Sequence, residues 1–492
     1  MAVLRRVLAV AVALVVTAGV AAAVPPAADA SPAARSFLRF AAPGTAPAGL
    51  GPADIASAYG LQGGVGGTVA IATAYDAPTL EADLAVYRST FGLPPCTSGD
   101  GCLRVVGQRG TSTRPAADVG WAQETSLDVD AVSAACPTCR ILVVEADDER
   151  LSSLGAAVDT AVRLGADAVS ASWGTTEWRT WRTAADEWFT HPGVPIVAAT
   201  GDDGEAPAVL PAALPGVIAV GGTTLTATAP GAQAPTTAYA VHEGTVTRAS
   251  TSAAVRRDER ALRTARAAHA AAKHRTVVAK HRLSAARAAL RHARPAARAH
   301  WRHVVASRSA AVAAARRTQS RRWQAVRAAE ARLLRDRTHA SAEAARAGQR
   351  SRAGWIETAW HGAGSGCSAY VPRPAFQRGT MCAGRSIADV AAVADPSTGL
   401  AVRDTHGTAD LTPDGWLVAG GTSLAAPLVA AMLVRSGHAA RYSSAAPLYA
   451  DPSRFWDVTA GSNGGCAGAL CMATPGPDGP TGLGTPRSLA AF

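Results

Sequence analysis

The sequence predicts an α/β domain, with a mostly parallel sheet covered by helices on both faces, into which an antiparallel helical hairpin is inserted. Short apolar runs alternate with stretches of helical spacing from Gly51 to about residue 235, and the same pattern resumes near Trp355. The stretch between them is dominated by Ala and Arg and has almost no Gly. Buried strands that alternate with amphipathic helices are typical of parallel sheets with two covered faces.

The first part of the domain supplies most of the expected elements. The predicted strands are the apolar runs at 68–73, 141–145, 168–172, 194–198 and 216–220, and the predicted helices are 80–91 and 151–164. The strand runs are short and apolar throughout, as expected for strands buried on both faces. The helices lie between strands, as a parallel sheet requires.

Residues 248–353 predict two long helices that fold back on each other. Residues with a seven-residue spacing are Val255, Leu262, His269, Thr276, Leu283 and Leu290 in the first arm, and Val305, Val312, Gln319, Val326 and Leu333 in the second. Pro295 stands between the arms, where a helix has to break. A disordered basic spacer is the alternative, and the abundance of strong helix formers favours the hairpin.

Charge is divided unequally between the hairpin and the rest of the chain. Residues 248–353 hold 27 of the 48 basic and 5 of the 37 acidic residues, which leaves 21 basic and 32 acidic residues elsewhere. An Arg-rich helical surface attracts polyanions such as cell-wall polymer, acidic lipid or nucleic acid. The alternative is that the arginines only keep the helices soluble. No base-reading motif is present, so sequence-specific DNA binding is not expected.

The first thirty residues have the pattern of an export signal. Arg5-Arg6 are followed by an apolar run from Val7 to Val24, and Ala28-Asp29-Ala30 fits a cleavage site. A retained membrane anchor is the alternative, since the apolar run is about the minimum spanning length. We expect a secreted, extracellular protein. Residues 31–50 are rich in Ala, Pro and Gly and predict a linker.

The eight cysteines fall into four close pairs, which predict disulfides in an exported chain. The pairs are Cys96/Cys102, Cys136/Cys139, Cys367/Cys382 and Cys466/Cys471. The CxxC pair could instead be a redox or metal half-site, but no second CxxC or His pair accompanies it.

Two acidic residues stand four apart in the stretch GWAQETSLDVDA, residues 120–131. On a helix, Glu124 and Asp128 would share one face and would titrate as a coupled pair. A solvated acidic face is the alternative. The apolar neighbours Trp121, Leu127 and Val129 favour burial instead.

The stretch GGTSLAAP, residues 420–427, is typical of a nucleophilic serine at the start of a helix. Ser423 would need a neighbour that takes its proton. His406 has a suggestive setting, DTHGT, but it lies only 17 residues before Ser423, so we expect a loop residue there and not a base. The carboxylate pair is the better candidate.

The chain resembles the sedolisin family of serine-carboxyl peptidases over roughly residues 45–235 and 354–492. The motifs that carry this resemblance, in order, are 124–128 (ETSLD), 197–204 (VAATGDDG) and 420–427 (GGTSLAAP). Flanking stretches agree, at 170–174 (SASWG), 221–225 (GGTTL) and 360–366 (WHGAGSG). Each motif alone is weak, and three in the right order are specific.

This resemblance implies a subtilisin-like fold with a changed catalytic group. Ser423 would be the nucleophile and Glu124 the general base, with Asp128 orienting Glu124 and holding the proton relay. Asp202 would be the oxyanion-hole residue. A carboxylate base and a protonated acid donor both favour acidic pH. The expected activity is that of a serine endopeptidase acting on peptides or proteins in acid.

The resemblance also assigns a substrate wall and a metal site. Residues 170–174 would form one wall of the cleft, with Ser172, Trp173 and Gly174 pairing with the substrate backbone. The C-terminal tail would bind Ca²⁺ through oxygen ligands, from the residues Asp457, Val458, Thr474, Gly476 and Asp478. The alternative for the tail is a Gly/Pro-rich segment with chance acidic residues.

The expected organisation is a signal at 1–30, a linker at 31–50, the catalytic domain at 51–247 and 354–492, and the basic insertion at 248–353. Members of the family usually carry a long N-terminal prodomain, whereas here the catalytic body begins about twenty residues after the signal. Self-processing of the usual kind is therefore not expected. The alternative function is a catalytically idle scaffold that binds polyanions through the hairpin.

Overall fold

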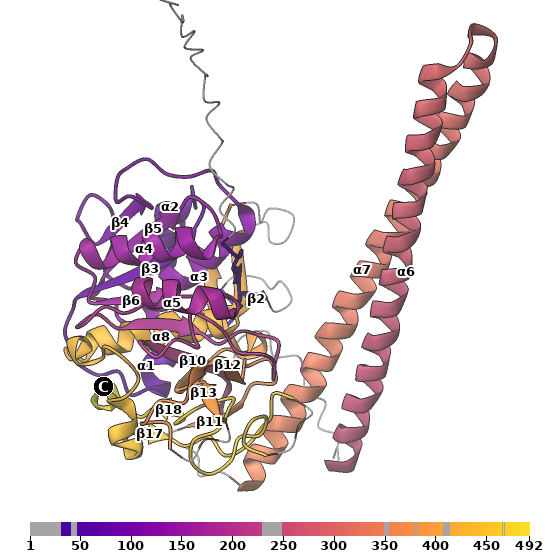
Figure 1. Cartoon of the computed structure of the whole chain (residues 1–492). Helices are drawn as coiled ribbons and strands as arrows, with labels where there is room; N and C mark the ends of the chain where they lie inside the picture. The colour runs from indigo at the N-terminus through magenta and orange to yellow at the C-terminus, as the bar shows by residue number, and fades with distance from the viewer. Residues whose placement is uncertain are drawn as a thin grey trace, which may run out of the picture.

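The computed structural model describes residues 31–40, 47–228, 248–348, 354–378, 380, 382–406, 414–464, 466 and 468–492. The predicted signal at 1–30 lies outside these residues. The predicted α/β domain and the helical hairpin are both present in the described part of the chain (Figure 1).

The centre of the domain is a largely parallel sheet in the order β11-β10-β8-β6-β3-β5-β4, with β14 also paired to β10. Its strands are β3 (Thr68–Ala74), β4 (Leu103–Gly107), β5 (Arg140–Ala146), β6 (Ala168–Ala171), β8 (Ile196–Ala199), β10 (Val217–Ala227), β11 (Trp355–Ala359) and β14 (Val390–Val393). Only the β10/β11 pair is antiparallel among them. The predicted mostly parallel sheet is confirmed.

Alternate residues of each strand enter separate apolar cores on the two faces of the sheet. In β3, Val69 and Ile71 belong to one core, while Ala70 and Ala72 belong to the other. The first core includes residues of α1 (Pro52–Ala58), α2 (Leu80–Thr90), α3 (Val119–Ala135) and α8 (Thr422–Arg435). The second includes residues of α4 (Leu151–Arg163) and α5 (Arg179–Trp188).

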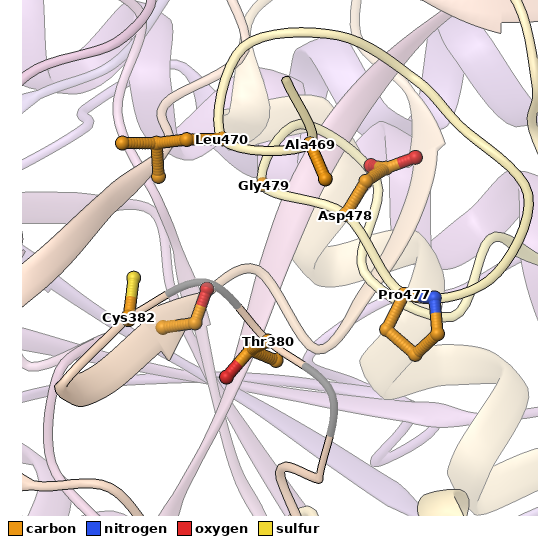
Figure 2. Close-up of a pocket in the computed structure, with 8 residues that line it drawn as sticks. Thr380, Cys382, Ala469, Leu470, Pro477, Asp478 and Gly479 are labelled. Carbon is orange, nitrogen blue, oxygen red and sulfur yellow. The ribbon is translucent and has the colours of Figure 1, made fainter.

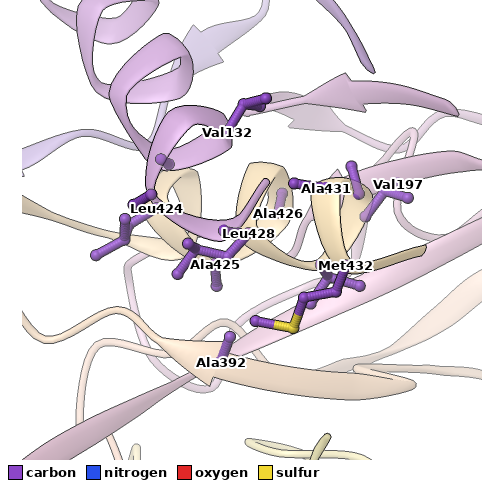
Figure 3. Close-up of a cluster of buried hydrophobic side chains, with 14 of the residues drawn as sticks. Val132, Val197, Ala392, Leu424, Ala425, Ala426, Leu428, Ala431 and Met432 are labelled. Carbon is purple, nitrogen blue, oxygen red and sulfur yellow. The ribbon is translucent and has the colours of Figure 1, made fainter. Parts of the chain in front are cut away.

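Helix α8 lies inside the domain and not on its surface. Every residue from Thr422 to Val434 is buried, and small residues let α3 and the strands come close to it. Figure 3 shows Leu424, Leu428 and Met432 of α8 beside Val132 of α3 and, among the strands, Val197 and Ala392. A helix that is apolar all round belongs in a core. The start of α8, which carries Ser423, is therefore held by packing on several sides.

Residues 31–40 are paired with the domain at both ends, although their composition predicts part of a linker. Strand β1 (Arg35–Ser36) pairs antiparallel with β7 (Trp173–Thr176), and β2 (Arg39–Phe40) pairs antiparallel with β16 (Trp416–Gly420). The backbone partners come from strands far away in sequence, so local composition gives no sign of them.

The remaining strands are short and lie outside the central sheet. They are β9 (Val209–Leu210), β12 (Gly366–Pro372), β13 (Gly384–Ile387), β15 (Leu400–Arg403), β17 (Phe455–Trp456) and β18 (Thr485–Pro486). The structure joins the cysteines in the four predicted disulfide pairs. None of the helices in the described residues is long and apolar enough to cross a membrane.

The hairpin consists of α6 (Arg248–His292) and α7 (Arg298–Gly348), which turn back at Pro295 as predicted. Leu262 and Val326 pack across a thin seam, and Leu283 and Val312 are also buried. The side chains of Val255 and Leu333 lie outside the described residues. The hairpin extends away from the domain in Figure 1.

The hairpin joins the domain between two paired strands, β10 and β11. Ala227 at the end of β10 lies opposite Trp355 at the start of β11. The Thr228 N–H donates to the Gly354 carbonyl at 2.7 Å. Because the chain leaves and returns at one place, the central sheet is not interrupted by the insertion.

Candidate active site

Helix α3 carries the two predicted acids into a dry environment. The Asp118 side chain caps the helix by accepting the Trp121 N–H at 3.1 Å. Glu124 and Asp128, one turn apart, are each only 1 % exposed. Burial raises the pKa of Glu124 well above its usual range, and the nearby Asp128 charge raises it further. Burial likewise raises the pKa of Asp128. A pair of this kind holds protons at pH values where free carboxyls have lost them.

Ser423 is the second residue of α8 and lies beside these acids. Its Oγ donates to the carbonyl oxygen of Ser172 at 3.1 Å. Its hydroxyl and that of Ser36 lower the pKa of Glu124, against the larger effect of burial. Neither Glu124 oxygen has a hydrogen-bond partner of normal geometry in the described residues. The Glu124 carboxyl is thus a neighbour of the serine hydroxyl with free acceptor capacity.

Ser172 connects Asp128 to the backbone of the serine. Its Oγ lies 2.6 Å from Asp128 Oδ1 and 3.2 Å from the Ser423 carbonyl oxygen. One hydroxyl hydrogen cannot serve both acceptors. If Asp128 is protonated and donates to Ser172, the Ser172 hydrogen is free for the Ser423 carbonyl, in keeping with the raised Asp128 pKa.

Pro427 explains why the Ser423 carbonyl needs an outside donor. In a regular helix this carbonyl would accept the N–H of the residue four positions later. That residue is Pro427, which has no N–H. The Ser172 hydroxyl takes the place of the missing helical donor, and so joins β6–β7 to the start of α8.

Asp202 follows β8 and reaches the first turn of α8. Its Oδ1 accepts the Thr422 N–H at 2.8 Å and the Thr422 hydroxyl at 2.9 Å. Its Oδ2 has no hydrogen-bond partner in the described residues, and Arg39 Nε is 3.6 Å away. Burial raises the pKa of Asp202 to about 7, although Arg39 and Thr422 act to lower it. Below that pH it can donate a hydrogen bond from Oδ2.

Three of the histidines outside the hairpin contact groups other than Ser423. The His191 ring contacts Asp159, and the His438 ring contacts the Phe492 carbonyl. His406 lies in a bend after β15, where its backbone N–H donates to Asp404 at 3.2 Å. His242 lies outside the described residues.

The predicted substrate wall lies beside Ser423, but one of its side chains belongs to the core. The Trp173 indole is buried, and its Nε1 donates to the Ala72 carbonyl at 2.8 Å. Only the backbone of Trp173 is therefore available for pairing. The segment 31–40 lies along this backbone, with Arg35 opposite Gly174 and Ser36 opposite Trp173.

The match to a family model decides which group of proteins this is. The subtilase-family model covers residues 116–447, which is well over half of the chain. The chain belongs to the subtilase family. A Pseudomonas sedolisin, a serine-carboxyl proteinase solved with pseudo-iodotyrostatin, is similar with 19% identity and a TM-score of 0.51, over 90% of this chain and 96% of that one. The fold is therefore shared with a solved sedolisin.

Two further solved structures are more distant. A lanthipeptide protease has 11% identity and a TM-score of 0.41, over 89% of this chain and 91% of that chain. Fervidolysin from Fervidobacterium pennivorans, a keratinolytic enzyme related to subtilisin, has 12% identity and a TM-score of 0.36, over 88% and 42% of the two chains. A comparison with curated proteins finds no significant match. As a subtilase, this protein is a serine-type peptidase that acts on peptides or proteins.

The C-terminal loop of this subtilase gathers the residues predicted to hold calcium. The Gly476 N–H donates to Asp457 Oδ2 at 2.9 Å, and the Thr474 N–H donates to Asp478 Oδ2 at 3.0 Å. Burial raises the pKa of Asp478 to about 7, and Asp457 adds to the effect. Two mutually repelling carboxylates beside a loop rich in carbonyls are a donor set that suits Ca²⁺. Figure 2 shows Asp478 at a small pocket between this loop and Thr380 and Cys382.

The described residues also contain one cluster of side chains of the kinds that bind metals, but its two cysteines have no free thiolate. Glu205 lies near Cys466 and Cys471, and these cysteines are joined in a disulfide. This group is not a metal site.

Sequence reasoning missed the residues that the N-terminal segment and the α8 turn bring to the site. Ser36 acts on Glu124, Arg39 contacts Asp202, and Thr422 holds the Asp202 carboxyl. Thr422 stands next to the predicted nucleophile, so its position was a usable signal. Ser36 and Arg39 gave no such signal, because no local sequence pattern indicates that they lie near residues 124 and 202.

The raised pKa of Asp202 predicts that the free energy of unfolding decreases as pH rises. A carboxyl with a pKa raised from 3.8 to about 7 stabilises the fold fully below its unfolded pKa. That contribution, on the order of 4 kcal/mol, is lost as pH rises through about 7. In a Ser423→Ala background, Asp202→Asn should flatten the dependence of unfolding free energy on pH between about 4 and 8. Denaturant titrations measure this.

Asp203→Asn is the matched control, because the Asp203 side chain is half-exposed and adjacent. An unchanged pH dependence in Asp202→Asn would show that Asp202 does not hold its proton in the folded state.

Proposed function

We propose that this subtilase is a sedolisin-type serine-carboxyl endopeptidase that cleaves peptide bonds at acidic pH. The observation that carries the proposal is the place of Ser423, at the start of the buried helix α8 and beside the buried Glu124 carboxyl of α3, whose two oxygens have no hydrogen-bond partner of normal geometry in the described residues. His191 and His438, by contrast, have ring contacts elsewhere. A serine needs a proton acceptor within reach, and the carboxyl on α3 supplies it.

Each acid in the site has a distinct task in this mechanism. Glu124 takes the proton from Ser423 Oγ as the hydroxyl attacks the substrate carbonyl, and returns it to the leaving amine. Asp128 keeps Glu124 poised through their coupled titration and holds Ser172 by its short contact. Neutral Asp202 donates from Oδ2 to the oxyanion, while Thr422 fixes its other oxygen.

Asp202 sets the alkaline limit of this mechanism. Its pKa of about 7 means that the donor proton is lost as pH rises past neutrality, and a carboxylate there would repel an oxyanion. Activity is therefore expected in acid and should decline through about pH 7.

Substitutions at the site should separate these tasks. Ser423→Ala should abolish cleavage of casein or a quenched peptide, and Glu124→Gln should lower kcat by about 10²–10⁴ because the base is lost. Asp130→Asn on the same helix is the control, because Asp130 accepts the Arg403 N–H and faces away from the serine. Full activity in Ser423→Ala, or an activity that is highest in alkali, would refute the mechanism. No cleavage by the wild-type chain would favour the idle-scaffold alternative.

Asp202 offers a further test within the same assay. An amide donates a hydrogen bond at every pH, so Asp202→Asn should extend activity above pH 7. Asp202→Ala should lower kcat by about 10²–10³, because the donor is removed. A wild-type alkaline limit in Asp202→Asn would contradict the role of Asp202.

We also propose that Ca²⁺ stabilises the C-terminal loop through Asp457, Asp478 and the backbone near Val458, Thr474 and Gly476. A bound cation would relieve the repulsion between the two carboxylates. In the Ser423→Ala background, removal of divalent ions with EDTA should lower Tm by several degrees, and Ca²⁺ should restore it better than Mg²⁺.

Asp478→Asn should have a low Tm that no longer responds to EDTA. Asp451→Asn, at an exposed site, is the control. A Tm of the wild-type sequence that is indifferent to EDTA would rule out a stabilising metal.

The basic hairpin suggests a second property, attachment to a polyanion. Exposed basic residues lie along both arms, among them Arg263, Lys273, Arg282, Arg302, Arg316 and Arg321. With the four disulfides and the signal pattern at 1–30, we propose an exported enzyme held near an anionic surface such as a cell wall.

Removal of the hairpin tests this attachment. Residues 229–353 can be replaced by a short Gly/Ser loop, because Thr228 and Gly354 are already hydrogen-bonded at 2.7 Å. The full chain should bind an anionic matrix at low salt and elute at high salt, whereas the shortened chain should flow through and keep its peptidase activity. No retention of the full chain at low salt would end the idea.

A further inference from the structure

The outer part of the hairpin carries positive charge only. Residues 260–329 hold 16 arginines, 2 lysines and no Asp or Glu. All of these basic side chains are exposed. The hairpin extends away from the domain in Figure 1, and the residues outside the hairpin are acidic on balance. An anionic partner can therefore contact the outer hairpin without approaching the domain, which would repel it.

Three of the cations form a row along one side of α6. Lys273, Lys280 and Arg287 follow one another at seven-residue intervals. Seven residues are close to two helical turns, so the three side chains leave α6 on nearly the same side, about 10 Å apart. The row therefore runs parallel to the axis of the hairpin.

The facing arm, α7, brings two further cations level with this row. The register of the two arms is set by Leu262, which packs with Val326 across the seam. Counting from this pair along the antiparallel arms places Arg316 and Arg302 opposite the two ends of the row. The five exposed cations are called the basic flank, and they are Lys273, Lys280, Arg287, Arg302 and Arg316.

A ring contact indicates that the cations of both arms lie on one side of the hairpin. The centres of the His269 and Trp323 rings are 5.2 Å apart. His269 stands one turn before Lys273 in α6. Trp323 stands two turns after Arg316 in α7. Residues one or two turns apart share a face of a helix, so the ring pair and the basic flank lie on the same side.

Trp323 adds an aromatic surface to the basic flank. Its side chain is 48 % exposed, although it already contacts His269. Trp and Arg are the side chains that most often dominate the free energy of binding at interfaces. Their combination on one side of the hairpin favours a binding surface over a side that is merely soluble.

The basic flank has no counterion within the described part of the protein. The ion pair of the hairpin among these residues joins Arg257 to Asp258, close to the domain. The five cations of the flank form no ion pair with any described residue. Like charges along one side repel each other, and a bound polyanion would relieve this repulsion.

The chemistry of the flank and the expected pH favour phosphate over carboxylate as the bound anion. Guanidinium groups bind phosphate through two parallel hydrogen bonds and keep their charge in acid. Carboxylate polymers lose much of their charge near pH 4, where the proposed peptidase would act. Phosphodiester groups stay anionic there. An attachment that persists in acid therefore requires a phosphate-bearing partner.

We propose that the basic flank binds a linear phosphodiester polymer of the cell wall, which lies along the hairpin and contacts Trp323. The proposal rests on the proposed attachment to an anionic surface and names its partner and its contact residues. Lys273 and Arg287 are about 20 Å apart along α6. A polymer of several repeat units can contact the whole flank, whereas a single phosphate ion cannot.

The experiment measures binding of the full chain, in the Ser423→Ala background, to soluble poly(glycerol phosphate) at pH 4. At about 150 mM salt, where screening limits the effect of charges that make no contact, replacing the five flank cations by Gln should weaken binding at least about 100-fold. The matched control replaces five exposed arginines on other sides of the same arms and should stay within about tenfold. The control residues are Arg275, Arg282, Arg308, Arg317 and Arg321.

The salt dependence of binding tests which cations contact the polymer. Each contacted phosphate contributes about 0.7 to the slope of log affinity against log salt, so the flank variant should lower the slope by about 3 and the control by less than about 1. Single Lys273→Gln and Arg287→Gln variants should each lower it by about 0.7, which tests the flank even if the fivefold variant loses helix in circular dichroism. Trp323→Ala should weaken binding about tenfold with an unchanged slope, because the ring carries no charge.

Competing polymers test the chemistry of the partner. Polyglutamate should bind at least about tenfold more weakly than poly(glycerol phosphate) at pH 4. Equal binding of the two polymers, or equal losses in the flank and control variants, would overturn the proposal. Tighter binding of single-stranded DNA than of poly(glycerol phosphate) would overturn the cell-wall partner and assign the flank to nucleic acid.

A failure of the proposed function gives different results. If the chain with an intact hairpin binds none of these polyanions at low salt, the proposed attachment itself fails. Peptidase activity is measured separately, in chains that keep Ser423, and its absence would refute the proposed enzyme without affecting the binding results.

Discussion

The packing of α8 against α3 inside the core is the constraint on which the site depends. It brings Ser423, Glu124 and Asp128 together from residues almost 300 positions apart and removes water from them. In water these carboxyls would be ionised and repel each other only weakly. In the dry interface burial raises the pKa values of Glu124 and Asp128, so they hold protons at pH values where free carboxyls have lost them. A more exposed α8 would leave a serine beside two ordinary carboxylates.

Ser172 and Pro427 fix the position of Ser423 relative to Asp128. Pro427 frees the Ser423 carbonyl from the helix, and Ser172 binds it while contacting Asp128 through the same oxygen. The Ser172 carbonyl also accepts both the Ser423 hydroxyl and the Phe37 N–H. Ser172 therefore contacts Ser423, Asp128 and the Phe37 backbone at once and fixes their relative positions. A polar network buried to this degree is stable only when its members satisfy one another.

The helical hairpin and the segment 31–40 differ in how they contact the domain. The hairpin is inserted between β10 and β11, whose ends remain paired, so the central sheet forms without a break at the insertion. The segment 31–40 contributes few residues, yet it pairs with β7 and β16, and its Arg39 contacts the buried Asp202. A long insertion thus leaves the central sheet intact, while a short Ala/Pro-rich stretch lies beside Ser423 and Asp202.

The sequence alone determined the alternation of strands and helices, the break at Pro295 and the disulfide pairs, and it singled out Ser423, Glu124, Asp128 and Asp202 as candidates for one site. These features are local: periodicity, helix-breaking residues, close cysteine spacing and short motifs in order. Only the tertiary structure decided that Trp173 turns its side chain into the core, that Thr422 holds Asp202, and that Phe37 lies beside Ser423. Some of these contacts join residues some 130 to 390 positions apart, and the Trp173 contact depends on which face of the strand points to the core. No local sequence pattern encodes such contacts or that orientation.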